Sequence, residues 1–244
     1  MRKLLTSFTA IYIFLNLFAV AEAHSVLIKR PVTNLAEQTR PVANFSAVAA
    51  AGAFNVVIKI GTTESLRLEG DDDLLNKIET VVENGTLKIR TQKGLENHRL
   101  NFDRVKVYVT AKALNAITLS GSGNMQLLDP VKAEAFSTTL SGSGNLETAT
   151  IETGKLSTQL SGSGNITTAG KAREVNVRVS GSGNFDGRKF TAQTADVRMS
   201  GSGNVSIEAN ETLNGTLSGS GRIYYSGNAK VTEVKSGSGQ IIKR

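Results

Sequence analysis

The feature of this sequence that most constrains its fold is a five-residue phrase, Ser-Gly-Ser-Gly-Asn, that recurs at nearly constant spacing. Two variants follow it, and successive phrases begin 21, 20, 19, 20, 18 and 18 residues apart. A fixed period of about 20 residues is typical of a solenoid, in which each repeat forms one coil that stacks on the next. The phrases and variants lie at Ser120–Asn124, Ser141–Asn145, Ser161–Asn165, Ser180–Asn184, Ser200–Asn204, Ser218–Arg222 and Ser236–Gln240.

The side chains of each repeat alternate in a way that predicts strands with one buried face. Counted from the first serine of the phrase as position 0, the apolar positions −5, −1 and +5 and the glycines at +1 and +3 are all odd. Because successive side chains of a strand point to opposite faces, the odd positions share an interior and the serines and asparagine share the outer face. Glycine at +1 and +3 permits a close backbone approach or a left-handed bend, so we expect a corner or a constriction at the phrase.

Stacking would align the outer serines and asparagines of the phrase in columns, with coils about 4.8 Å apart. Such columns can hydrogen-bond along the stack and can offer aligned donors and acceptors to a ligand. The alternative is that these side chains only satisfy the backbone around the glycine corner, and for each residue taken singly this structural role is favoured. The candidate ligand ladder consists of Ser122, Asn124, Ser143, Asn145, Ser163, Asn165, Ser182, Asn184, Ser202 and Asn204.

The region before the first phrase is expected to be less regular. Alternating apolar residues such as Val56 and Ile58 indicate short strands. Asp71–Asp73 supply N-cap candidates, and apolar residues at helical spacing then predict one short helix near 72–83 that stops at Asn84-Gly85. The aspartates lack the spaced ligands of a calcium loop, so capping accounts for them better than a metal site.

The first 23 residues have the pattern of a cleaved signal peptide. A basic start, Met1–Lys3, precedes an apolar run from Leu4 to Val20, and Ala21–Ala23 fits a small-x-small cleavage site. The alternative is a retained transmembrane anchor, because the uncharged run just reaches spanning length. With cleavage, no integral membrane span remains, and we expect export to the periplasm, the cell surface or the medium.

After the leader, residues 24–44 are predicted to form an extended linker or pairing arm, because Pro31 and Pro41 each restrain the preceding residue to extended geometry. Residues 45–244 are then a single β-helix domain, with irregular coils over 45–113 and regular coils over 114–244. In the last coil the interior offsets carry Glu233 and Lys235, charges that would discourage edge-to-edge growth. A one-residue shift that points Val234 inward is an equal alternative.

Composition excludes several classes of chemistry. The formal charge of +7 could attract lipopolysaccharide or acidic polysaccharide, but no block of five basic residues or aromatic interleaving favours nucleic acid. There is no cysteine, the only histidines are His24 and His98, and the acidic residues of the repeats share no common offset. We therefore predict no catalytic residues, no metal site and no cofactor.

The repeated hydrophobic-Ser-Gly-Ser-Gly-Asn-hydrophobic phrases, preceded by the β-rich region Phe54–Thr110, resemble the putative auto-transporter adhesin head GIN domain family of exported bacterial proteins. The resemblance covers roughly Phe45 to Ile242. It implies a right-handed parallel β-helix of about 18–21 residues per coil, and it suggests surface adhesion. It brings no catalytic residues with it. The last two phrases depart from the pattern in spacing and in their final residue.

Three functions remain for such a chain. The first is a non-catalytic, adhesin-like scaffold at the surface or in the periplasm that binds a glycan or a cell-surface component. The second is a polysaccharide-active β-helix enzyme, which would need paired carboxylates on one face. The third is an assembly module, a homo-oligomer formed through an end coil or by strand addition. The absence of a catalytic constellation favours the first.

Overall fold

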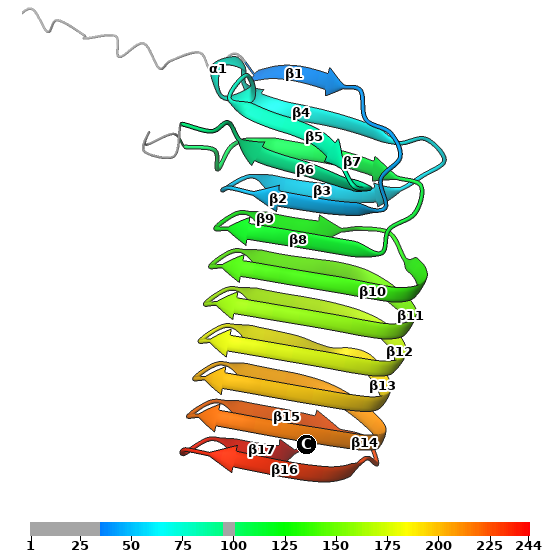
Figure 1. The fold of residues 1–244 in the computed structure, drawn as a ribbon, viewed down its shortest axis with the longest axis vertical. Helices are drawn as coiled ribbons and strands as arrows, with labels where there is room; N and C mark the ends of the chain where they lie inside the picture. Colours follow the sequence, from blue (N-terminus) through cyan, green and yellow to red (C-terminus); the bar gives the residue numbers. More distant parts are fainter. Residues whose placement is uncertain (1–34, 95–100) are drawn as a thin grey trace, which may run out of the picture. The chain divides into compact units, whose positions relative to one another are not determined.

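The computed structural model describes residues 35–94 and 101–244, and over residues 114–244 the coils stack one upon the next (Figure 1). The predicted parallel β-helix is confirmed, because each repeat pairs in parallel with the equivalent residues of the following repeat. The predicted signal peptide, residues 24–34, and both histidines lie outside the described residues. None of the helical structure in the described ranges has the length and hydrophobicity that crossing a bilayer requires.

Strands make up almost all of the regular structure in the described ranges. One short helix, α1 (Asp72–Leu75), follows β4. The strands are β1 (Leu35–Arg40), β2 (Ala47–Ala51), β3 (Asn55–Ile60), β4 (Ser65–Asp71), β5 (Ile78–Glu83), β6 (Thr86–Thr91), β7 (Lys106–Ala111), β8 (Ala116–Gly121), β9 (Asn124–Leu127), β10 (Val131–Gly142), β11 (Asn145–Gly162), β12 (Asn165–Gly181), β13 (Asn184–Gly201), β14 (Asn204–Gly219), β15 (Arg222–Ser226), β16 (Lys230–Ser236) and β17 (Gln240–Lys243).

Each coil has two sides joined by a corner at the phrase. We call the segments that lead into a phrase the first sheet, and those that follow a phrase the second sheet. Strands β2, β8 and β16 belong to the first sheet, β3, β9, β15 and β17 to the second, and β11 to β14 run from the second sheet through the opposite bend into the first. Register shifts between the phrases, such as that between Gly187 and Thr191, absorb the unequal repeat lengths.

The phrase is a corner, and both of its glycines are required there. The glycine at +1 ends a strand with a positive φ, for example 124° at Gly142 and 118° at Gly162. A Cβ on either phrase glycine would lie closer than 3.0 Å to a backbone oxygen of the coil before, as at Gly142 and Gly144. The close approach is therefore between stacked coils, and only glycine allows both the bend and the contact.

On either side of each phrase the odd positions form the core, as their parity predicts, but at the opposite bend the parity is lost, because the buried Ile151 and Phe190 lie at even offsets. The largest side chains inside, Phe54, Phe136, Phe185 and Phe190, are at most 1% exposed. Over residues 35–94 and 101–244 the buried polar side chains are four threonines, whose hydroxyls pair between adjacent coils at 2.8 Å, Thr138 with Thr158 and Thr148 with Thr168. Within the described residues no buried side-chain nitrogen or oxygen lacks a partner, so the interior is filled and satisfied.

The predicted helix near 72–83 is wrong beyond Leu75. Asp71 does cap α1, accepting a hydrogen bond from the Asp73 backbone nitrogen at 3.0 Å. Residues Ile78–Glu83 instead form β5, which pairs antiparallel with β6 through the two-residue turn Asn84-Gly85. Both turn residues have positive φ, 49° and 72°, as a tight hairpin turn needs. The β-branched run and the partner strand outweigh the helical spacing of the same residues.

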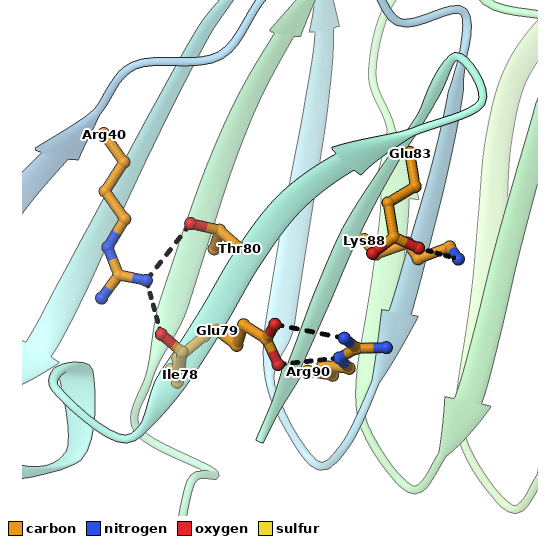
Figure 2. Close-up of polar contacts among 7 residues, drawn as sticks. All are labelled: Arg40, Ile78, Glu79, Thr80, Glu83, Lys88 and Arg90. Carbon is orange, nitrogen blue, oxygen red and sulfur yellow. Dashed lines mark hydrogen bonds and ion pairs between the residues drawn. The ribbon is translucent and has the colours of Figure 1, made fainter. Parts of the chain in front are cut away.

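Antiparallel strands cover the N-terminal end of the stack. Strand β1, within the predicted arm, pairs with β4, and β4 pairs with β7. Arg40 at the end of β1 donates to the backbone oxygens of Leu75 and Ile78 at 2.7 and 2.5 Å and to the Thr80 hydroxyl at 3.3 Å. Figure 2 shows this guanidinium reaching from β1 to β5. Its hydrogen bonds therefore tie β1 to β5 and to α1.

Ion pairs reinforce the β5–β6 hairpin beside it. Arg90 binds the Glu79 carboxylate through two hydrogen bonds of 2.9 and 3.1 Å, and Lys88 lies 2.6 Å from Glu83 (Figure 2). These contacts lower the pKa of both carboxyl groups.

The last coil keeps the register of the others. Glu233 pairs with Gly215 and Lys235 with Leu217, while Val234 is 60% exposed. The alternative in which Val234 points inward is therefore wrong. The two charged side chains form an ion pair of 3.0 Å, which lowers the cost of placing charges at interior offsets.

Replacing a phrase glycine should destabilise the stack. We expect Gly142→Ala to lower the free energy of unfolding by roughly 1–3 kcal/mol from backbone strain alone, and by more because of the clash with Gly121. The control is Gly85→Ala, where φ is also positive but no atom lies within 4 Å of the added Cβ. Guanidinium unfolding followed by circular dichroism measures both. Equal losses in the two variants would show that the stacked contact is unimportant.

Candidate binding surface

The asparagines of the phrase form one continuous hydrogen-bonded ladder. The side-chain nitrogen of each asparagine donates to the side-chain oxygen of the asparagine one coil earlier, at 2.9 Å for Asn145 to Asn124 and for Asn165 to Asn145. The same contact, again 2.9 Å, joins Asn184 to Asn165 and Asn204 to Asn184. All five predicted asparagines are thus brought together, and much of their hydrogen-bonding capacity is used within the protein.

The ladder begins one coil earlier than the sequence suggested. Asn124 donates to Asn55 at 2.8 Å, and Asn55 donates to the backbone oxygen of Asp103 at 2.8 Å. Ala51 pairs with Ser120 and Asn55 with Asn124, so residues 51–55 occupy the place of a phrase. The available signal was Gly52 at +1 and Asn55 at +4, without either serine. Sequence reasoning therefore missed Asn55.

The predicted serines lie on the outside of the same corner. Ser122, Ser143, Ser163, Ser182 and Ser202 are all exposed. From Ser143 onward their backbone nitrogens bind the +1 glycine oxygen of the preceding coil, at 3.1 Å for Ser143 and 3.0 Å for Ser163. No hydrogen bond within the described residues engages their hydroxyl groups. The serines, unlike the asparagines, keep their side-chain donors and acceptors available, and their role in binding a ligand stays a prediction.

A hollow of about 690 Å³ lies on the bend opposite the phrase. Lys132, Glu152, Lys171 and Arg173 contribute charges, and the half-buried Ala133 contributes apolar surface, whereas the neighbouring Ala172 and Ala192 are buried. Glu152 lies between two of these cations, 3.1 Å from Lys132 and 3.6 Å from Lys171. The hydrogen bond from Lys132, with the positive charge of both lysines, lowers the pKa of the Glu152 carboxyl. The hollow therefore combines a small apolar surface with a charged rim.

Groupings for metal or acid–base chemistry are lacking in the described residues. No group of three or more histidine, aspartate or glutamate side chains is placed to hold a metal ion in residues 35–94 and 101–244. The pKa of Glu174 is lowered by hydrogen bonds from Lys155 and Asn176, and that of Asp186 by a hydrogen bond from Arg188. Lowered values favour the ionised carboxylate, the opposite of what a general acid needs.

Comparison with known proteins gives a family and a set of related folds. A family model described as "Putative auto-transporter adhesin, head GIN domain" matches residues 44–229. No curated protein matches the chain significantly.

Solved structures repeat the architecture over most of the chain. A crystal structure of a "putative adhesin" from Bacteroides fragilis is 23% identical with a TM-score of 0.79, covering 88% of this chain and 99% of that one. A "putative lipid binding protein" from Parabacteroides distasonis is 25% identical with a TM-score of 0.71, covering 86% and 97%. A "putative adhesin" from Parabacteroides merdae is 19% identical with a TM-score of 0.68, covering 86% and 96%.

Interrupting the asparagine ladder should cost stability. We expect Asn165→Ala, which removes the hydrogen bonds to Asn145 and from Asn184, to lower the free energy of unfolding by about 1–2 kcal/mol. Thr167→Ala is the matched control, because Thr167 is exposed on the same strand and makes no side-chain hydrogen bond within the described residues. Chemical denaturation compares the two. If both variants unfold like the wild type, the ladder contributes nothing to stability.

Proposed function

The chain belongs to the family described as "Putative auto-transporter adhesin, head GIN domain", and we propose that it is an exported, non-catalytic scaffold that binds a glycan or another cell-surface component. The observation that carries this proposal is the repetition of exposed polar groups on a rigid stack. Equivalent serine hydroxyls stand on successive coils, unengaged within the described residues, while the ladder and the glycine corner hold their spacing constant. A polymer with its own repeated hydroxyl groups complements such a surface.

The chemistry of the described residues supports binding rather than turnover. Hydrolysis of a polysaccharide needs a pair of carboxyl groups, one of them with a raised pKa. Here neighbouring cations and hydrogen bonds lower the pKa of the carboxyl groups whose pKa is shifted, such as those of Glu152, Glu174 and Asp186. The family and the related structures carry adhesin or lipid-binding names, not enzyme names.

Export is supported by the N-terminal pattern of residues 1–23, a basic start, an apolar run and a small-x-small site. Cleavage after Ala23 would release a protein beginning at His24. An adhesin has to reach the outside of the cytoplasmic membrane, so this pattern agrees with the family name.

The test is retention of glycans and of cells by mature protein, residues 24–244. Because the surface repeats, a polysaccharide can contact several coils at once and should bind much more tightly than the monosaccharide of which it is made. The ratio of the two affinities should exceed the number of sugar units in the chain. A glycan array followed by competition with monomer and polymer measures this. No retention of any glycan or cell surface would contradict the proposal, and release of reducing sugar would contradict its non-catalytic part.

A second candidate function is lipid binding, which the hollow on the bend favours. The related structure from Parabacteroides distasonis bears that name. Because the interior is filled, a lipid would have to lie outside, with its anionic head at Lys171 and Arg173 and its acyl chain beside the half-buried Ala133.

Laurate is a suitable probe for that surface. If the hollow binds lipid, laurate should bind the wild type, and Lys171→Glu with Arg173→Glu should weaken binding by repelling the carboxylate. Lys59→Glu with Lys106→Glu is the control, because it makes the same charge change on exposed residues of β3 and β7. Isothermal titration calorimetry measures laurate binding by the wild type and by both double variants. Absence of laurate binding, or equal weakening by both double variants, would remove this candidate.

A further inference from the structure

Two arginines stand one above the other on the outer face of the first sheet. Arg178 of β12 and Arg198 of β13 occupy paired positions of adjacent parallel strands, and both are exposed. Like charges at directly opposed positions destabilise a sheet. A pair that weakens the scaffold in this way is a candidate for a role outside folding.

The carboxylates of this face neutralise only one of the two arginines. Asp196 lies 3.2 Å from Arg198. Glu174 is engaged by Lys155 at 2.8 Å and by Asn176 at 2.7 Å. Arg178 forms no ion pair with any of the described residues. The guanidinium of Arg178, with its five N–H donors, therefore faces solvent without a counter-charge. Beside it lies the guanidinium of Arg198, which has one carboxylate partner, Asp196.

The arginines line a hollow whose other polar groups are hydroxyls and an amide. Its volume is about 480 Å³. The serines at position 0 of successive phrases line one side of this hollow. In the neighbouring column, Gln159 pairs with Arg178 and Thr216 pairs with Arg198, so these two residues extend the arginine pair by one coil in each direction. A second hollow, of about 250 Å³, shares Gln159 and Arg178 with the first. The serines of the column are Ser161, Ser180, Ser200 and Ser218.

We propose that Arg178 and Arg198 together hold an oxyanion group of an acidic polysaccharide that lies along the stack, across β11 to β14. The two guanidiniums, about 4.8 Å apart by strand spacing, would share one carboxylate or sulfate through charge-assisted hydrogen bonds. The adjacent serine hydroxyls, with Gln159 and Thr216, would meet the sugar hydroxyls above and below. This assignment rests on the proposed glycan-binding function and names its ligand class and site.

The surroundings favour a glycan over nucleic acid. Single-stranded nucleic acid is held by aromatic side chains on which the bases stack, and no aromatic residue lines either hollow. A lone phosphate would use the arginines but not the hydroxyl groups that extend over four coils, a span of roughly 14 Å. A chain of hydroxylated units with periodic negative charge uses both.

Three polysaccharides test the assignment on mature protein: polygalacturonate, which carries carboxylates, dextran sulfate, which carries sulfates, and neutral dextran. We expect one or both acidic polymers to bind, and neutral dextran to bind much more weakly. Arg178→Gln with Arg198→Gln should weaken that binding roughly tenfold or more, as the loss of charge-assisted hydrogen bonds implies. Comparison of the two acidic polymers identifies which oxyanion the site prefers.

Lys59→Gln with Lys106→Gln is the matched control, since it removes two positive charges from exposed positions of β3 and β7 outside this face. It should leave binding within about twofold of the wild type, because only long-range attraction changes. The arginine variant should unfold at the same temperature as the wild type or higher, because it relieves the like-charge pair and loses only the exposed ion pair with Asp196, which contributes little to stability. Its loss of binding then cannot be attributed to misfolding.

The outcomes separate this inference from the proposed function. Equal weakening by both double variants, or undiminished binding by the arginine variant, overturns the assignment of the site. Retention of neutral but not acidic glycans overturns the ligand class while leaving the scaffold function intact. If neither glycans nor cell surfaces are retained, both proposals fail together.

Discussion

At every phrase, two glycines lie against the backbone of the coil before, so closely that a Cβ on either would come within 3.0 Å of its atoms. The stack depends on this contact. It lets the chain bend from the first sheet of each coil to the second while the corners of successive coils stay in contact. It also places the odd positions beside each phrase on the inside. Backbone bonds from Ser143 and Gly144 to Gly121, at 3.1 Å, repeat from coil to coil at the same corner. The threonine pairs and the asparagine ladder then join coils whose register the corner has already set.

The repeat makes the architecture predictable from the sequence, and the wrong predictions lie where the repeat is absent or incomplete. Near the phrases, parity alone separates interior from exterior, because a strand alternates and each phrase returns above the one before. At the opposite bend it does not, because register shifts there absorb the unequal repeat lengths and bury even positions such as Phe190. The segment Ile78–Glu83 was misread as helix because its apolar spacing suits either structure, and the strand depends on pairing with β6, a tertiary contact. The coil at Ala51–Asn55 was hidden because its serines are absent and Phe54 replaces the second glycine. That replacement is possible because no phrase precedes it in the stack.

The phrase that dominates the sequence is mainly committed to holding the fold. Its asparagines bond to one another, and its glycines fill a space that no other residue can. Groups that remain available to a partner lie beside it, the exposed serine hydroxyls and the arginines at 178 and 198. Both arginines occupy position −2 of successive repeats, where the other coils carry other residues, and the pairing of β12 with β13 places them side by side. The residues that recur in every coil hold the surface in place, and residues that occur in only some coils, such as the two arginines, give it charge.

The phrase is a structural corner rather than a loop kept open for a ligand. Amide hydrogen exchange, measured by NMR on the protein without ligand, tests it directly. The backbone nitrogens of Ser143, Gly144 and Asn145 donate to oxygens of the preceding coil. Their exchange should therefore be as slow as that of the core residue Leu146 of β11, which follows directly. Exchange at these three amides near the rate of an unstructured chain, while Leu146 stays protected, would show instead that the phrase is an open loop.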